Sequence, residues 1–140
     1  MPKTEPVNLR TAELSLHERS RTAFAAATAA GLPGQFRAFE RGGLLALLTT
    51  APGLSFLNSV TGLTQESLEV LPEVMAVFAA ARVSSVSLAA GEPTPALVAG
   101  LHRLGFVSAR PRPAGIIDLR TGHAAAGADG LRLTEARTPE

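Results

Sequence analysis

Residues 97–106 constrain the fold of this chain more than any other segment, because they contain an amphipathic helix and its stop signal. Leu97, Leu101 and Leu104 recur at the spacing of one face of an α-helix. Gly105 follows at the position where a glycine commonly ends a helix in the left-handed conformation. The segment therefore predicts a helix that connects two strands, with its leucines holding it on the sheet.

Capping residues mark where two helices begin and end. Thr94 is typical of an N-cap and precedes a proline at the first helical position, so it starts the helix just described. Ser15 and Glu18 have the spacing of a capping box, in which each side chain bonds the backbone amide of the other residue. Together with Gly31 as a stop signal, they predict a helix over residues 16–30.

Strand and turn signals dominate the middle of the chain. Two strand-like runs at 35–40 and 44–50 flank the Arg-Gly-Gly sequence at 41–43, which predicts a hairpin. A turn at 51–53 leads to a third predicted strand at 54–60. We therefore expect an antiparallel meander in this part of the chain.

Pro72 interrupts a helical pattern that extends over residues 64–82. A proline inside a helix removes a hydrogen bond and clashes with the preceding turn. We expect one short turn before Pro72 and a helix over residues 72–81. Three further strands are predicted around the last helix, at 83–88, 106–109 and 115–119.

The composition describes one domain and excludes several classes of function. Of the 140 residues, 46% are hydrophobic, which is ample for a single core. The net charge of +1 gives no signature of nucleic-acid binding, and the basic residues at 110–112 are too few for it. Without cysteine, disulfides and thiolate metal ligands are excluded. The phenylalanines are interpreted as core residues: Phe24, Phe36, Phe39, Phe56, Phe78 and Phe106.

No apolar run approaches the roughly 18 residues of a membrane span. Residues 1–10 lack the apolar region of a signal peptide. We therefore expect a cytoplasmic protein.

The order of these elements resembles the GNAT acetyltransferase superfamily over residues 15–120. The sequence Arg-Leu-Gly-Phe at 103–106 is similar to the Leu-Gly-Phe or Leu-Gly-Tyr step that closes the fourth helix of that family. The resemblance implies an α/β fold of the GNAT-like (acyl-CoA N-acyltransferase) type, with a central mixed, mostly antiparallel sheet flanked by helices. It also implies that the intact protein is an acetyl-CoA-dependent N-acetyltransferase.

A change in composition after residue 120 predicts a second domain. Residues 121–130 are small, polar and glycine-rich, which is typical of a linker. Residues 131–140 resemble the opening strand and helix cap of a second GNAT-like domain, and the run at 42–63 is similar to one in two-domain acetyltransferase-like proteins. We expect the amino-terminal half of a tandem protein, preceded by a lead-in at residues 1–14.

The resemblance places the acyl-CoA loop of the family at residues 58–64. In the family, successive backbone amides of a Q/R-x-x-G-x-G/A loop hold the pyrophosphate. This segment has Asn58, one glycine at Gly62, and Thr64, and it lacks the leading arginine or glutamine. Side chains at the lost glycines would crowd a pyrophosphate, so the alternative interpretation is a strand end followed by a helix cap.

The general acid of the family is absent. The resemblance implies an asparagine early in the fourth helix and a tyrosine later in it, commonly the general acid for the departing thiolate. Thr94 and Leu101 occupy these positions, and the sequence contains no tyrosine. We therefore assign no catalytic residue and no metal site, and we expect acetyl-CoA to bind the intact protein but not this chain alone.

Other polar residues are interpreted as solvated. The histidines are far apart, and the glutamates near Pro72 fit a solvated helix face better than a general base or a metal pair. The serines of the predicted strand lack the glycine elbow of a hydrolase nucleophile. These residues are His17, His102 and His123; Glu66, Glu69 and Glu73; and Ser84, Ser85 and Ser87.

Two hypotheses about function remain open. In the first, this GNAT-like domain is not catalytic by itself and supports a carboxy-terminal GNAT domain, by covering one side of the acceptor groove or by forming a homodimer contact. In the second, the chain is a self-contained, non-enzymatic module that binds a small ligand or a protein in a cleft between the strands predicted at 54–60 and 83–88. Neither hypothesis involves nucleic acid or a membrane.

Overall fold

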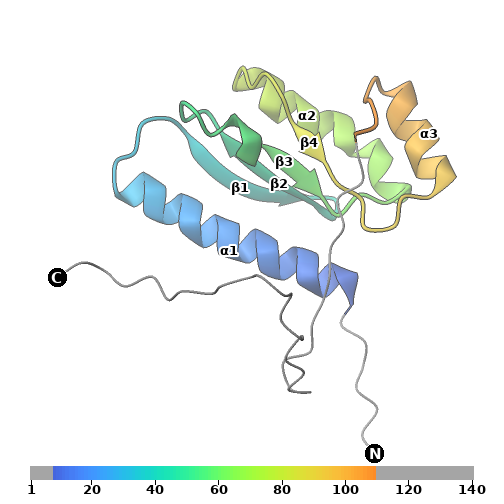
Figure 1. Cartoon of the computed structure of the whole chain (residues 1–140), viewed down its shortest axis with the longest axis horizontal. Helices are drawn as coiled ribbons and strands as arrows, with labels where there is room; N and C mark the ends of the chain where they lie inside the picture. Colours follow the sequence, from blue (N-terminus) through green and yellow to red (C-terminus); the bar gives the residue numbers. More distant parts are fainter. Residues whose placement is uncertain (1–7, 110–140) are drawn as a thin grey trace, which may run out of the picture. The chain divides into compact units, whose positions relative to one another are not determined.

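A mixed four-stranded sheet forms the centre of the structure, a computed structural model that describes residues 8–109. Strands β1 (Phe36–Arg41), β2 (Leu44–Thr49), β3 (Ser59–Thr61) and β4 (Ser87–Leu88) lie side by side in chain order (Figure 1). β2 pairs antiparallel with both β1 and β3, whereas β4 pairs parallel with β3. The expected α/β fold with a mixed, mostly antiparallel sheet is confirmed at this level.

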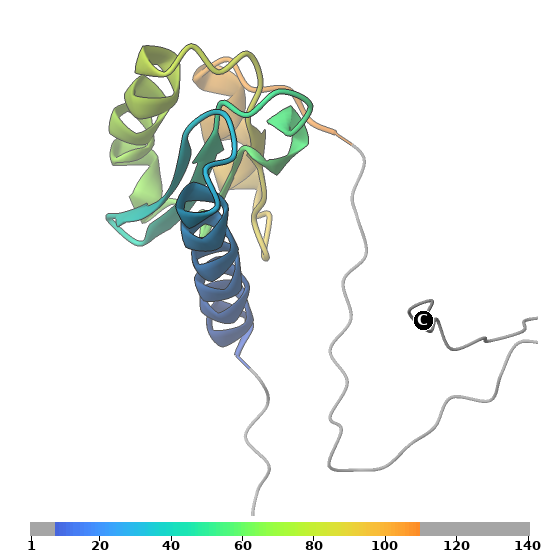
Figure 2. The same ribbon diagram turned by 90° about the vertical axis from the view of Figure 1, so that its left-hand side faces the viewer.

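Helices lie on both sides of this sheet (Figure 2). α1 (Leu9–Ala29) runs along β1 and β2 on one face. α2 (Leu71–Ala80) packs on the opposite face, and α3 (Pro95–Arg103) follows β4. The parallel pairing of β3 with β4 requires a crossover connection, which α2 provides.

The first helix begins earlier than its sequence predicts. α1 starts at Leu9, where the side chain of Asn8 accepts a hydrogen bond of 2.9 Å from the amide two residues later. The predicted capping box at Ser15 is wrong, because Ser15 lies inside the helix and Glu18 bonds the side chain of Arg21 at 2.7 and 3.0 Å. Helix residues therefore occupy part of the segment expected as a lead-in.

The predicted hairpin is confirmed. β1 and β2 pair from Phe36 opposite Thr49 to Arg41 opposite Leu44. The two residues between the strands, Gly42 and Gly43, have φ angles of 55° and 82°. A two-residue turn with both φ angles positive matches the twist of the flanking strands and favours glycine at both positions. The Gly-Gly pair therefore determines both the turn and the register.

The third strand is shorter than predicted. Of residues 54–60, Ser55–Leu57 form a short 3-10 helix, and β3 begins only at Ser59. Between them, the side chain of Asn58 bonds the backbone of Thr49 in the place of a strand partner. The 3-10 helix leaves the Phe56 side chain 73% exposed, so its assignment to the core is wrong.

The interruption expected at Pro72 is confirmed. A short 3-10 helix at Glu66–Glu69 precedes α2, and Pro72 lies in the first turn of α2, where its missing amide leaves no intrahelical bond unmade. The turn and the helix are therefore separate elements. Just after α2 and its C-cap residue Ala81, Arg82 is in the left-handed conformation, with a φ angle of 58°.

The ends of α3 follow the sequence closely. The Thr94 side chain accepts a hydrogen bond of 3.2 Å from the amide of Leu97. At the other end, Gly105 has a φ angle of 95°, and the amide of Phe106 bonds the carbonyl of Leu101, as in a Schellman motif. Both predicted boundaries are confirmed.

Only part of the predicted leucine face of α3 is buried. Leu97 is 2% exposed and belongs to the core, and Leu101 is half-buried. Leu104 is 46% exposed, because it is the C-cap residue, where the chain leaves the helix. The prediction that Leu104 holds the helix on the sheet is therefore wrong.

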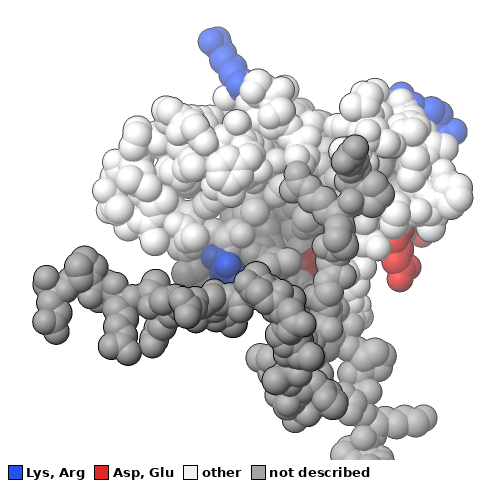
Figure 3. Space-filling view, viewed as in Figure 1, with Lys and Arg blue, Asp and Glu red and all other residues white. Residues whose placement is uncertain are grey.

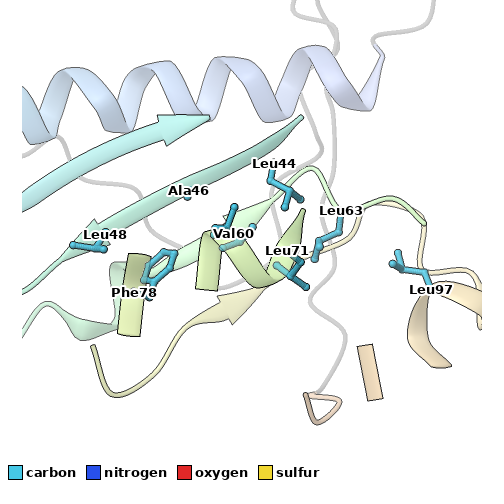
Figure 4. Packing of buried hydrophobic residues seen from close by; sticks show 9 residues of the cluster. Leu44, Ala46, Leu48, Val60, Leu63, Leu71, Phe78 and Leu97 are labelled. Carbon is cyan, nitrogen blue, oxygen red and sulfur yellow. The ribbon is translucent and has the colours of Figure 1, made fainter. Parts of the chain in front are cut away.

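The main apolar core lies between the sheet and α2 (Figure 4). Alternate residues of β2 point toward this core. The ring centroids of Phe39 in β1 and Phe78 in α2 are 6.3 Å apart. On the opposite face, Phe24 of α1 meets Phe36 of β1 edge-on at 5.5 Å. Members of the main cluster are Leu44, Ala46, Leu48, Val60, Leu63, Leu71, Val74, Phe78 and Leu97.

Two other strand predictions are wrong: one strand is much shorter than predicted, and the other does not form. Of the strand expected at 83–88, only Ser87 and Leu88 pair with β3. Residues 106–109 form no strand, because the amide of Phe106 bonds back to the end of α3. Strand length depends on a partner at the right distance, which the local pattern does not specify.

Several sequence predictions concern residues outside the described range. These are the lead-in before residue 8, the basic residues at 110–112, the strand at 115–119, the linker at 121–130 with His123, and the segment at 131–140. Among the described residues, no helix combines the length and the apolar character needed to cross a membrane.

Candidate functional site

Four segments of the chain line a hollow of about 420 Å³ at one end of the sheet. They are the start of α1, the turn between β1 and β2, the segment after β3 and the segment after β4. Its charged residues are Arg10 and Glu13 from α1 and Glu92 from the segment after β4. The hollow also includes Gly62 and Thr64, two residues of the predicted acyl-CoA loop.

Asn58, the first residue of that loop, has a structural role. It is buried, and its Oδ1 accepts a hydrogen bond of 2.7 Å from the amide of Thr49. Its Nδ2 donates to the carbonyl groups of Thr49 and Ser55, both at 3.2 Å. Asn58 therefore satisfies buried backbone groups where the β2–β3 ladder stops, and its amide group is not directed at a ligand.

Thr64 and Ser67 cap each other. The amide of Thr64 donates to Oγ of Ser67 at 2.8 Å, and the amide of Ser67 donates to Oγ1 of Thr64 at 3.3 Å. The Ser67 hydroxyl also donates to the carbonyl of Thr64 at 2.8 Å. The interpretation as a strand end and helix cap describes this segment, and the Thr64 amide is already hydrogen-bonded within the chain.

Close packing explains why residue 62 is a glycine. Its φ angle is +79°, and a Cβ atom there would lie 2.5 Å from Nη1 of Arg10 and 2.7 Å from the carbonyl oxygen of Gly43. Any larger residue would force these groups apart. The one glycine of the predicted loop therefore accommodates Arg10 and the hairpin turn.

Arg10 is the functional candidate that the sequence did not reveal. The predicted loop lacks an arginine of its own, but the structure brings one from the first turns of α1. Nη2 of Arg10 lies 3.7 Å from a carboxylate oxygen of Glu40, and both side chains are substantially exposed. An ion pair of this length and exposure contributes little to stability.

Glu13 lies one turn after Arg10 on α1 and faces the same region. Its Oε2 atom is buried and has no hydrogen-bond partner among the described residues. A buried polar atom without a partner is uncommon in folded proteins. Oε2 of Glu13 is therefore an unsatisfied atom enclosed by the protein next to the hollow.

His17 is less solvated than predicted. It is half-buried in α1, and this burial lowers the pKa of the imidazole below its ordinary value of 6.5. The negative charges of Glu40 and Glu18 oppose the shift. The prediction of a fully solvated histidine is therefore wrong, because α1 lies close to the hairpin at this position.

The remaining polar candidates lie on the surface. His102 is exposed, with Nε2 2.8 Å from Oγ of Ser108. Glu73 bonds Arg41 at 2.9 Å, and within residues 8–109 no group of three histidines or carboxylates could hold a metal ion. The other predicted candidates in this range are exposed as well: Glu66, Glu69, Ser84, Ser85 and Ser87.

The two residues that the resemblance aligns with the asparagine and the tyrosine of the GNAT family also have structural roles here. Thr94 caps α3, and Leu101 is half-buried and packs against the core. Neither contributes a side chain that donates or accepts a proton at a reacting group.

The third and fourth strands pair at the place where the second hypothesis expects a cleft between them. Ser59 and Val60 of β3 pair directly with Ser87 and Leu88 of β4. The hollow described above lies instead beyond the carboxyl ends of these two parallel strands, where open α/β sheets commonly bind ligands.

The view in Figure 3 shows few charged side chains, and they are widely separated. On this face, the described residues therefore form no basic patch of the kind that binds nucleic acid. No protein-family model, no curated protein and no solved structure matches the chain.

Proposed function

We propose that this chain is a GNAT-like domain that supports N-acetyl transfer by a partner domain without catalysing the reaction itself. The supported activity is transfer of an acetyl group from acetyl-CoA to a primary amine. The support consists of covering one side of the acceptor groove or contacting a second copy of the chain. The partner domain is the one that residues 131–140 are predicted to begin.

The order and pairing of the strands support the fold part of this proposal. β1, β2 and β3 form a meander, α2 leads to a strand parallel to β3, and α3 follows. This is the order that the resemblance implies from its first helix to its fourth. The Leu-Gly-Phe step closes α3 through the hydrogen bond from Phe106 to Leu101.

One observation supports the proposal that this domain does not catalyse the reaction itself. The backbone of the segment after β3 is already in contact with other residues of the chain. A pyrophosphate needs several backbone amides that point at it across an open, glycine-rich surface. Here Ser67 accepts from the Thr64 amide, and the space next to Gly62 is taken by Arg10 and the hairpin turn. The absence of tyrosine from the sequence removes the usual general acid as well.

Calorimetric titration of the whole chain with acetyl-CoA tests this proposal. We expect no saturable heat. A dissociation constant in the ordinary cofactor range, about 1 to 100 μM, would contradict it. If such binding occurred, nuclear magnetic resonance shifts of the Gly62 and Thr64 amides on addition of acetyl-CoA would show whether the site lies on this loop.

The second candidate function, a small-ligand-binding module, is favoured by a different observation. The hollow beside α1 has a volume typical of sites for small molecules, and charged residues from two different segments line it. This candidate does not require an acetyltransferase partner.

A further inference from the structure

One exposed face of α1 carries four residues whose order is self-complementary. Leu14, Glu18, Arg21 and Ala25 recur at spacings of three and four, so they share one side of the helix, and all four are exposed. When a second copy of α1 lies antiparallel to the first about the midpoint of residues 19–20, Glu18 faces Arg21 of the second copy. Leu14 then faces Ala25, so a large side chain meets a small one. Both contacts recur on the other side of the midpoint, as a two-fold symmetric interface requires.

This face of α1 is directed toward the open edge of the sheet. The Leu9 side chain lies next to Gly91, which follows β4. Arg10, about 100° further around the helix, forms an ion pair with Glu40 of β1. Leu14 lies further around in the same direction. The face that includes Leu14 is therefore turned away from β4 and toward the outer edge of β1.

That edge presents unpaired backbone groups. Among the described residues, β1 is the first strand of the sheet and pairs only with β2. The Thr50 amide donates to the Gln35 carbonyl, and such hydrogen-bonded residues alternate along an antiparallel pair. Backbone groups of the odd-numbered residues of β1 therefore point toward β2, whereas those of Phe36, Ala38 and Glu40 point toward the open edge. No proline or bulge interrupts β1, so nothing in the strand itself blocks a further strand.

A second copy of β1 can pair antiparallel with this edge about Ala38, the central residue of the three. Ala38 then opposes its own counterpart, and Phe36 opposes Glu40, so the open backbone groups all acquire partners. On the α2 face, Arg37 opposes Phe39. Within one chain, the Arg37 guanidinium already lies 4.9 Å from the centre of the Phe39 ring. The same cation–π contact is available between the two copies.

The helix face and the strand edge share one symmetry axis. Phe24 of α1 meets Phe36 of β1, and α1 and β1 run in opposite directions (Figure 1). Ala38 lies two residues beyond Phe36, which is about 6.6 Å along a strand. Along a helix, this distance corresponds to about four and a half residues. Counted back from Phe24, it reaches the midpoint of residues 19–20, about which the face of α1 is self-complementary.

We propose that this surface binds a second copy of the chain in a two-fold symmetric dimer. The two β1 strands pair to continue the sheet, and the two α1 helices pack antiparallel on one face of it. α1 contacts both β1 and β2, so its axis lies inward of the open edge and leaves room for the second helix. This dimer is the homodimer form of the proposed function, so the inference rests on that function, although its geometry comes from α1 and β1 alone.

Sedimentation equilibrium of the whole chain tests the dimer. We expect a reversible dimer with a dissociation constant of about 1 to 10 μM. Glu18→Arg places arginines opposite Arg21 of the second copy, and Arg21→Glu places glutamates opposite Glu18. Each variant should therefore dimerise at least tenfold more weakly. Arg19→Glu is the matched control, because Arg19 is exposed on another side of α1, and it should dimerise as the unmodified chain does.

An equimolar mixture of the two charge-reversed variants distinguishes a lost contact from a damaged fold. Each variant alone opposes like charges, but a mixed dimer places arginines opposite glutamates. We therefore expect the mixture to dimerise about as tightly as the unmodified chain.

Hydrogen exchange tests the strand part of the interface. The amides of Ala38 and Glu40 should exchange at least tenfold more slowly in the dimer than in the monomeric Arg21→Glu chain. The Phe39 amide, which points toward β2, is the internal control and should be protected in both.

Four results would overturn the proposal: an unmodified chain that stays monomeric at about 100 μM, dimerisation unchanged by either charge reversal, no mixed dimer between the folded variants, or equal exchange of the Ala38 amide in dimer and monomer. The first result needs no variant, so it decides the matter whether or not the variants fold. Titration with acetyl-CoA tests the non-catalytic role separately, so failure of that role is distinguishable from failure of the dimer.

Discussion

The two faces of the sheet are built differently. On the α2 face, β2 contributes fully buried leucine and alanine side chains that pack against Val74 and Phe78. On the α1 face, Phe24 is the buried residue of the helix, and the partly buried residues of α1 include the polar side chains of Arg10, Glu13 and His17. The first turns of α1 instead bring Arg10 and Glu13 to the end of the sheet.

This difference separates the part of the domain that stabilises it from the part that can hold a ligand. Burial of apolar surface provides most of the favourable free energy of folding, and the α2 face buries more of it. Burying a charged group is unfavourable, so charged side chains are found where the packing leaves access to solvent. The comparison predicts that the two faces respond differently to substitution.

The largest expected effect concerns the aromatic rings of the two faces. Phe78→Ala should lower the free energy of unfolding by about 3 to 5 kcal/mol, because Phe78 lies within the main apolar cluster. Phe24→Ala should cost at least about 1 kcal/mol less, since α1 offers fewer apolar neighbours. Urea denaturation of both variants measures the two losses. An equal or larger loss for Phe24 would break the comparison.

Asn58 tests how far polar bonds stabilise the end of the β2–β3 ladder. Asn58→Ala leaves buried backbone groups of Thr49 without partners, so we expect a loss of about 2 kcal/mol. Ser59→Ala, one residue further along the chain, is the control and should stay within about 0.5 kcal/mol of the unmodified protein. Denaturant melts measure both. A loss for Asn58→Ala no greater than that of the control would refute its structural role.

Arg82 tests whether the left-handed backbone after α2 reduces the stability of the protein. Its φ angle of 58° lies in the left-handed region that favours glycine, so Arg82→Gly should stabilise the protein by about 1 kcal/mol. Arg82→Ala removes the same charge but retains a Cβ atom, and it should bring no gain. Thermal melts distinguish the two variants. Equal stability of both would mean that charge, and not backbone conformation, determines the effect.

The smallest expected effect is a pH dependence of the free energy of unfolding that is caused by His17 of α1. Burial lowers the pKa of His17 in the folded state, so below about pH 6.5 the unfolded chain binds the proton more readily. Stability should therefore fall as the pH falls from about 7 toward 5. His17→Gln should reduce this slope, whereas His102→Gln, an exposed control in α3, should not. A slope unchanged by His17→Gln would contradict the assignment.

Sequence patterns alone predicted the local features of this fold. Thr94, Gly105 and the Gly42–Gly43 turn were assigned correctly because caps, stops and two-residue turns depend on backbone geometry within a few residues. The break at Pro72 was correct for the same reason. The order of helices and strands over residues 16–105 followed from these signals together with hydrophobic periodicity.

Strand lengths and the exposure of Phe56 could not be predicted, because pairing joins residues that are distant in the sequence. A strand ends where its neighbour offers no partner, as at Asn58, whose side chain takes over the bonds to Thr49. The start of α1 was missed because the favourable capping spacing at Ser15 and Glu18 competes with the true cap at Asn8. Local patterns cannot rank two such signals without the packing of the whole helix.

The candidate site shows most clearly which features depend on local sequence and which depend on tertiary contacts. The sequence by itself determined that a lone Gly62 follows a strand, that no tyrosine is present, and that Thr64 can cap a helical turn. Only the tertiary structure decided that Gly62 accommodates Arg10, and that Glu13 and Glu92 face the same hollow. The reason is physical: a capping bond forms between neighbours along the chain, whereas a binding hollow exists only after the sheet has brought distant segments together.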